Sequence, residues 1–234
     1  MTSIINWLTS NDARTFYLLM GISLVINRLP YIGVFFRTLN TLLHESGHAL
    51  MSILTSGEVV RIDINNDTSG IAQTKSSNKF KAFLTSFSGY PFAALCGSLF
   101  ITMAINDQHK VVAFILLSIV LLNLMLFVRN LFGIIWLILF SALLVSFLVY
   151  AKDQLLQFFI LFISMIAATE AFSSTMVITF LGLANPRKAG DFTNMQKSSG
   201  IPAAFWALVN CAAVLWVLYY TMVHYFPGID RALI

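Results

Sequence analysis

Residues 41–54 read TLLHESGHALMSIL, an apolar run that contains two histidines and a glutamate. The whole chain shares the apolar character of this run, since 58% of its 234 residues are hydrophobic and only 10% are charged. Ordinary globular chains carry about a quarter charged residues. A chain with so few charged residues has too little polar surface for a water-soluble fold. We therefore expect an integral membrane protein that is embedded in the lipid bilayer.

The charge and the cysteines exclude several classes of function. The net charge of +4 comes without a basic run interleaved with aromatic residues, so we expect no nucleic-acid partner. The two cysteines, Cys96 and Cys211, lie in hydrophobic surroundings and predict neither a disulfide framework nor a cysteine zinc cluster. Residues 1–14 lack the pattern of a cleavable signal peptide, so the first apolar stretch is expected to stay in the membrane.

Hydropathy predicts six or seven membrane-spanning helices, each needing roughly 20 mostly apolar residues. The candidate segments lie at about 15–35, 38–55, 80–105, 111–128, 131–150, 155–183 and 200–226. Arg28 and Pro30 predict a break at membrane depth inside the first segment, and Arg129 with Asn130 separates two short runs. We therefore predict an all-α polytopic membrane protein that forms a single domain over residues 1–234.

Two polar islands interrupt the apolar segments. The first, at about 57–75, alternates as VVRIDI and SGIAQT around an Asn/Asp/Gly turn, which predicts a small β-hairpin at the membrane edge. The second is a polar loop at about 184–199. A count of seven spans places both islands on the N-terminal side, with nine Lys and Arg against five, so the positive-inside rule predicts that this side is cytoplasmic.

The quoted run has the spacing of a metal site. His44 and His48 are four residues apart, so on a helix both imidazoles lie on one face and can reach one ion, with Glu45 beside them. A catalytic Zn²⁺ takes three protein ligands and a water, and an adjacent carboxylate can act as general base. A buried hydrogen-bonded cluster is the alternative. An ionisable side chain in hydrocarbon costs about 2.5 to 3.5 kcal/mol, so three in one turn favour the metal.

A third ligand must come from elsewhere in the chain. Asp191, in the second polar island, would complete a His₂-carboxylate set, which is an accepted zinc arrangement. Alternatively, Asp191 could cap a helix that begins at the following residues, 192–197. His109 and His224 are the remaining histidines, and their positions near segment ends are typical of solvated interfacial residues.

Other polar residues of the apolar segments are candidate supports of this site. Glu170, in ISMIAATEAFSSTMVITF (163–180), could hold a ligating histidine by its second nitrogen, serve as an alternative ligand, or bond to nearby Ser and Thr. Asn123 and Asn130 fit helix-to-helix hydrogen bonds or a local cap. The sequence SGYP at 88–91 predicts close packing or a kink.

These residues together resemble the site-2 protease-like intramembrane metalloproteases, and more closely the peptidase M50B-like membrane proteins. The likeness rests on LLHESGHAL (42–50), the hairpin-like segment, SFSGYPFAALCGSLF (86–100), VRNLFG (128–133), Glu170, GDFTNM (190–195) and GIPAAFWALV (200–209). The resemblance implies a zinc protease that cuts membrane protein segments, with His44, His48 and Asp191 as ligands and Glu45 as the base. Asp191 follows RKAG and precedes Phe, unlike the Leu-Asp-Gly setting of better-studied site-2 members.

The leading function hypothesis is an intramembrane zinc-dependent endopeptidase that acts on a membrane protein substrate. In this hypothesis the hairpin presents an edge strand on which the substrate pairs as an extended strand. The alternative is a non-proteolytic metal-binding membrane protein that binds membrane helices or acts as a regulator. A transporter that uses Glu45 and Glu170 along an ion path would require paired halves with broken helices, and no such symmetry is evident.

Overall fold

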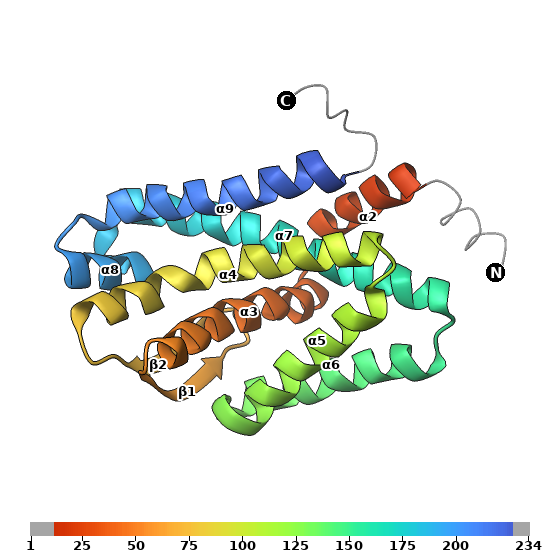
Figure 1. Cartoon of the computed structure of the whole chain (residues 1–234), viewed down its shortest axis with the longest axis horizontal. Helices are drawn as coiled ribbons and strands as arrows, with labels where there is room; N and C mark the ends of the chain where they lie inside the picture. Colours follow the sequence, from red (N-terminus) through yellow and green to blue (C-terminus); the bar gives the residue numbers. More distant parts are fainter. Residues whose placement is uncertain (1–11, 227–234) are drawn as a thin grey trace.

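The computed structural model describes residues 12–226 as a bundle of long helices with a small two-stranded sheet on one flank (Figure 1). The α-helices are α2 (Asp12–Ile26), α3 (Ile32–Leu54), α4 (Lys79–Ile105), α5 (His109–Leu122), α6 (Leu131–Tyr150), α7 (Asp153–Ala184), α8 (Asp191–Ser199) and α9 (Ala203–Tyr225). A π-helical turn, η1 (Asn123–Phe127), continues α5, and a 3₁₀ turn, η2 (Pro186–Lys188), follows α7. The strands are β1 (Glu58–Ile64) and β2 (Gly70–Lys75). The predicted α-helical fold with a hairpin is confirmed.

Five of these helices are long and apolar enough to cross a membrane: α4, α5 with its π-helical continuation, α6, α7 and α9. The 23-residue α3 is also long enough, but it carries the polar residues of the quoted run. The helix α2 is shorter, with 15 residues. A chain of this composition is a multi-pass membrane protein.

Helices α2 and α3 are joined by a short break, residues 27–31. The break contains Pro30, and it falls inside the segment predicted at about 15–35. Just after α2, the side chain of Asn27 donates to the Ile166 carbonyl (3.4 Å) and to Thr169 Oγ1 (3.1 Å), both near the middle of α7. The break therefore lies at mid-depth in the bundle, as Pro30 predicts, where α7 supplies partners for its polar groups.

The break between α2 and α3 decides which chain segments share an end of the bundle. Along the long axis of the bundle α2 and α3 advance the same way, and each later long helix runs opposite to the one before it (Figure 1). The chain therefore makes six passages, because α2 and α3 together make one. The hairpin and α8 lie at one end, and the start of α2 and the end of α9 lie at the other (Figure 1). The seven-span placement of the N-terminal side together with the hairpin is thus wrong, since Pro30 divides one passage rather than separating two.

Helix α4 is central, because it packs against α3, α7, α8 and α9. Its interior Pro91 cannot donate to the carbonyl of Phe87 one turn earlier. Asn210 of α9 donates to that carbonyl instead, at 3.2 Å. The proline therefore fits in a membrane helix because a neighbouring helix satisfies the freed backbone group.

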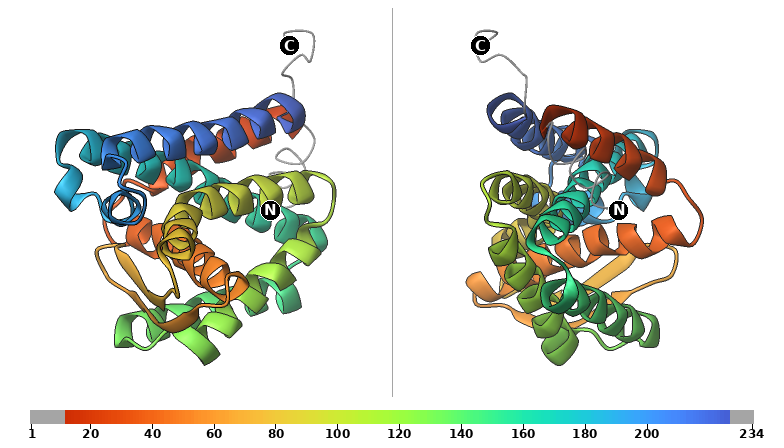
Figure 2. Two further views of the ribbon diagram at one scale, coloured as in Figure 1. Left: turned by 60° about the vertical axis from the view of Figure 1, so that its left-hand side comes forward. Right: turned by 90° about the vertical axis from the view of Figure 1, so that its right-hand side faces the viewer.

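The hairpin pairs β1 and β2 antiparallel and lies against α3. Hydrogen bonds from the side chain and the backbone N–H of Ser69 lower the pKa of Asp67, which keeps a carboxylate acceptor in the turn. Within β1, Ile62 and Ile64 are fully buried. Figure 2 shows that the hairpin covers one side of α3, close to the junction of α5 and α6. The hairpin is therefore packed on the bundle rather than projecting from it.

Candidate metal centre

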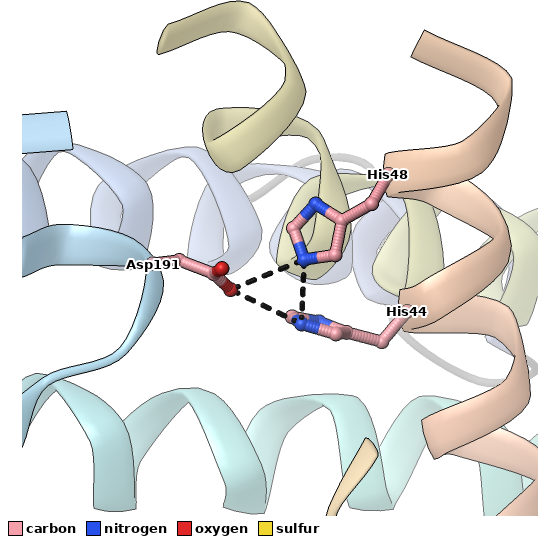
Figure 3. Close-up of side chains that lie close together, drawn as sticks. All are labelled: His44, His48 and Asp191. Atoms are coloured by element: carbon pink, nitrogen blue, oxygen red, sulfur yellow. Dashed lines mark hydrogen bonds and ion pairs between the residues drawn. The ribbon is translucent and has the colours of Figure 1, made fainter. Parts of the chain in front are cut away.

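Three side chains from two distant parts of the chain converge beside α4. The Nε2 atoms of His44 and His48 on α3 are 3.0 Å apart, and each lies 3.2 Å from Oδ2 of Asp191 on α8 (Figure 3). One possible ligand atom from each residue lies within 4.8 Å of the others. In the described residues 12–226, this is the one group of three or more His, Cys, Asp or Glu side chains that could hold an ion.

A glycine of α4 makes room for the two imidazoles. A Cβ at Gly89 would lie 2.5 Å from Cε1 of His44 and 2.7 Å from Nε2 of His48. The next residue, Tyr90, packs its ring edge-on against His44 with ring centroids 4.3 Å apart. The SGYP segment, which the sequence offered as a packing or kink element, therefore forms the wall against which both rings rest.

The second nitrogen of His48 is held by a backbone group. Its Nδ1 lies 2.6 Å from the carbonyl oxygen of Thr85, so Nδ1 carries the hydrogen and donates it. This tautomer leaves the lone pair of Nε2 free to bind an ion, which is the usual arrangement at metal-bound histidines. Sequence reasoning missed Thr85, because a backbone carbonyl carries no residue-type signal.

Asp191 points at the histidines and does not cap a helix. It is the first residue of α8, the N-cap position is Gly190, and no side chain makes a cap hydrogen bond there. Burial by itself would raise the pKa of Asp191, but His48 and His44 outweigh it and hold this pKa below its ordinary range. Asp191 is therefore a carboxylate that faces two imidazoles.

Glu45 lies on the same helical turn and faces the hairpin. It is 4% exposed and lies against the backbone N–H of Ala72 on β2. A Cβ at the neighbouring Gly70 would collide with Oε1 of Glu45. The glutamate and the three converging side chains all line one cavity of about 480 Å³, whose walls are α3, β2, α7 and the start of α8.

Glu170 does not hold either imidazole. It is buried on α7 but does not line the cavity, and its Oε2 makes no hydrogen bond within the described residues. Arg37 and Arg28 are the charged side chains that act electrostatically on it. One turn further along α7, Ser174 accepts a hydrogen bond from Asn40 (3.3 Å), and both of these residues line the cavity. Polar groups thus continue from the cavity into the interface of α3 and α7.

The remaining candidates have other contacts. Asn123 joins two helices, because its side chain donates to Ser46 Oγ of α3 at 3.0 Å. Asn130 stands at the N-cap position of α6 but makes no cap hydrogen bond, and its amide contacts β1 instead. His109 lies 3.2 Å from Asp153 at the opposite end of the bundle. None of these three residues approaches the converging group.

A family model described as peptidase M50B-like matches residues 16–221. The chain belongs to the peptidase M50B-like family. The match runs from within α2 to within α9 and includes the four cavity residues described above. No curated protein and no solved structure matches the chain significantly. Membership in the M50B-like family implies a membrane metallopeptidase, in agreement with the apolar helices and the converging histidines.

The donor set of this M50B-like chain fits zinc. Tetrahedral ligands about 2.0 to 2.1 Å from Zn²⁺ stand about 3.3 Å from one another. The three donors here are separated by 3.0 to 3.2 Å, and two of them are imidazole nitrogens while the third is a carboxylate oxygen. Three such protein donors are what a catalytic zinc takes, with the fourth position left for water or substrate.

Proposed function

We propose that this M50B-like chain is a zinc-dependent endopeptidase that cleaves membrane-embedded or membrane-proximal protein segments. The observation that carries the proposal is the convergence of His44, His48 and Asp191 beside Glu45 in one cavity of a membrane helix bundle. Family membership supports the peptidase class. Intramembrane cleavage is supported by the position of α3, which packs against the membrane-crossing helices α4 and α7.

In this proposal His44, His48 and Asp191 hold the metal, and Glu45 moves the protons. A bound zinc polarises the scissile carbonyl and lowers the pKa of water to about 7. Glu45 accepts a proton from the attacking water at a carboxylate oxygen and returns it to the leaving amine nitrogen. The Thr85 carbonyl keeps the ring of His48 in one orientation while this happens.

The outer edge of β2 is suited to bind the substrate as an extended strand. Residues opposite each other in an antiparallel pair alternate between pairs that bond to each other and pairs whose backbone groups point outward. Ile62 and Ile64 of β1 use their backbone groups on the outer side of β1, so the groups of their partners Ala72 and Gly70 point away from β1 as well. Ala72 and Gly70 line the cavity. A segment paired there would have its amides out of helical hydrogen bonding and beside Glu45.

The distribution of basic residues favours a cytoplasmic site. The end of the bundle that holds the site carries Arg61, Lys75, Lys79, Lys81, Arg129, Arg187, Lys188 and Lys197. The opposite end carries Arg14, Lys110 and Lys152. Arg28, between α2 and α3, and Arg37, in α3, belong to neither end, and Arg231 lies outside the described residues. Because cytoplasmic ends are enriched in Lys and Arg, the positive-inside rule assigns the site end to the cytoplasm. The assignment made from the sequence is kept, although the start of α2 lies at the other end of the bundle.

The test compares three purified proteins in detergent: wild type, Glu45→Gln and Glu58→Gln. Zinc is measured by mass spectrometry of the protein, and cleavage is measured with fluorescein-labelled casein and a panel of single-span reporter proteins. Glu45→Gln should retain zinc and lose cleavage by at least about 100-fold, because general acid–base catalysis contributes 10²–10⁴-fold. Glu58→Gln is the matched control, because Glu58 is exposed on β1 and pairs with Lys75.

Two outcomes would count against the proposal. A wild-type protein without stoichiometric zinc would remove the metal, and His44→Ala with the same zinc content as wild type would remove the assigned site. Zinc in all variants with no cleavage difference between Glu45→Gln and wild type would instead favour a metal-binding membrane protein without proteolytic activity.

A further inference from the structure

The two outer edges of the hairpin differ, because another chain segment pairs with the edge of β1 but not with the edge of β2. The outer edge of β1 is occupied by the segment that connects η1 to α6. Val128 forms a parallel bridge with Ile62, and the backbone N–H of Arg129 donates to the Ile62 carbonyl at 3.3 Å. This segment acts as a short third strand, so the hairpin has one open edge, which belongs to β2 and faces the cavity.

The side chain of Asn130 completes this third strand. Its Oδ1 accepts from the backbone N–H of Ile64 at 3.0 Å, and its Nδ2 donates to the carbonyl of the same residue. One amide side chain thus replaces both hydrogen bonds that a neighbouring strand would offer. Gly133, one turn into α6, makes room for it, since a Cβ there would lie 2.7 Å from Oδ1 of Asn130.

A short path of contacts leads from Asn130 to the catalytic carboxylate. Asn130 holds Ile64, and the cross-strand partner of Ile64 is Gly70. Gly70 in turn lies so close to Glu45 that a Cβ on it would collide with Oε1. Ile64 is fully buried, so this end of the hairpin cannot swing into solvent. The position of β2 above the carboxylate of Glu45 is therefore fixed from the far side of the sheet.

We propose that Asn130 is a positioning residue for peptide hydrolysis: it fixes the height and register of β2 relative to Glu45 and so decides which bond of a bound extended segment is cut. The proposal rests on the proposed function, because it assumes that substrate pairs with the open edge of β2. Asn130 itself touches neither substrate nor metal. Its loss should therefore loosen substrate binding and the choice of bond while leaving the zinc site intact.

The experiment uses the full chain in detergent and compares wild type, Asn130→Ala, Asn130→Asp and Asn106→Ala. The aspartate keeps the acceptor for the Ile64 N–H but loses the donor. Asn106 is the matched control, because its side chain also bonds to a backbone carbonyl, that of Thr102, but at the opposite end of the bundle. Hydrogen exchange is followed over residues 58–75, and casein fragments are sequenced to locate the bonds cut.

Each hydrogen bond contributes about 1 kcal/mol, so losing two should speed exchange of the hairpin amides by about 30-fold. We expect Asn130→Ala to raise KM for casein by a similar factor, with kcat and zinc content close to wild type and with a wider set of cleaved bonds. Asn130→Asp should also exceed wild type in exchange and in KM, because its second carboxylate oxygen would face the Ile64 carbonyl, acceptor against acceptor. A purely structural role would instead lower the amount of active enzyme, which reduces kcat and leaves KM unchanged.

Wild-type exchange and wild-type KM in Asn130→Ala would each overturn the inference, as would a lower kcat with an unchanged set of cleaved bonds. A wild-type protein that binds zinc but cuts no probe would overturn the proposed function, and the substrate-positioning role with it. Exchange in Asn130→Ala would then report only on whether this side chain holds β1. If Asn130→Ala does not fold, Asn130→Asp, which keeps the acceptor for the Ile64 N–H, provides the same comparison.

Discussion

Gly89→Ala is the sharpest test of the metal centre, because it changes no ligand. The added methyl would lie 2.5 Å from Cε1 of His44 and 2.7 Å from Nε2 of His48. Ordinary contact begins at 3.4 Å, so the two rings must move apart from the methyl by about 0.9 and about 0.7 Å. Zinc sites keep their ligand distances within about 0.2 Å. The displacement therefore exceeds the tolerance of the site severalfold.

The rings have little freedom to absorb this movement. His48 is tied through Nδ1 to the Thr85 carbonyl, and His44 rests against the ring of Tyr90. Changes to the groups that orient metal ligands typically weaken metal affinity by 10–100-fold. Because the methyl acts on both rings at once, we expect zinc affinity to fall by about 100-fold or more, as measured by competition with a chromophoric chelator.

Two other glycine variants separate this effect from loosened packing. Gly97→Ala lies on the same helix, and its methyl would meet the backbone of Ala168 on α7 at 2.9 Å, away from the imidazoles. Gly21→Ala on α2 meets nothing within 4 Å. We expect Gly97→Ala to lower thermal stability without changing zinc affinity, and Gly21→Ala to change neither for the worse. Zinc affinity within about threefold of wild type in a folded Gly89→Ala protein would refute the geometry on which the reasoning depends.

Three further predictions concern the cavity, the bundle and the orientation. Gly70→Ala should reduce kcat with zinc content unchanged, because its methyl would collide with the Glu45 carboxylate; an unchanged kcat would contradict the placement of β2. Asn210→Leu should lower the free energy of unfolding by about 1–3 kcal/mol in denaturant titration, since the carbonyl freed by the proline of α4 loses its donor; unaltered stability would mean that this bond contributes nothing. A membrane-impermeant maleimide applied from the cytoplasm should label Lys197→Cys and spare Lys110→Cys, and the reverse pattern would invert the orientation.

The part of the site that lies within one helical turn could be predicted from the sequence. The spacing of His44 and His48 on a helix brings their rings to one face whatever the rest of the fold does. Asp191 is 143 positions after His48, and its contact with the imidazoles depends on how α8 packs on α4. The sequence therefore offered ligand and cap as alternatives for Asp191, and only the packing of the helices brings its carboxylate to the histidines.

The contacts that orient the site lie beyond such reasoning, because backbone groups and empty space make them. The Thr85 carbonyl holds His48, and the missing side chain of Gly89 admits both rings. Every residue type has a backbone carbonyl, and the role of a glycine depends on which side chains pack against it, so neither contact can be predicted from a local sequence pattern. Glu170 illustrates the converse: a buried carboxylate suggests a functional role from the sequence, but in the structure it lies outside the cavity, and the charged groups that act on it are Arg37 and Arg28. The number of times the chain crosses the bundle likewise depends on the direction that α3 takes after Pro30, and local hydropathy does not predict that direction.

The open edge of the hairpin and the polar cavity are one feature rather than two. A two-stranded sheet has two edges of unpaired N–H and C=O groups, and such groups are costly where water is scarce. The edge of β1 is satisfied by the chain itself, through Val128, Arg129 and Asn130. The edge of β2 meets instead the cavity that holds Glu45, where Ala72 directs its N–H toward the carboxylate. An extended substrate would supply backbone groups that hydrogen-bond to this edge. Unpaired backbone groups destabilise a hairpin at a membrane, and the same groups would therefore favour binding of a peptide beside the residues proposed to cut it.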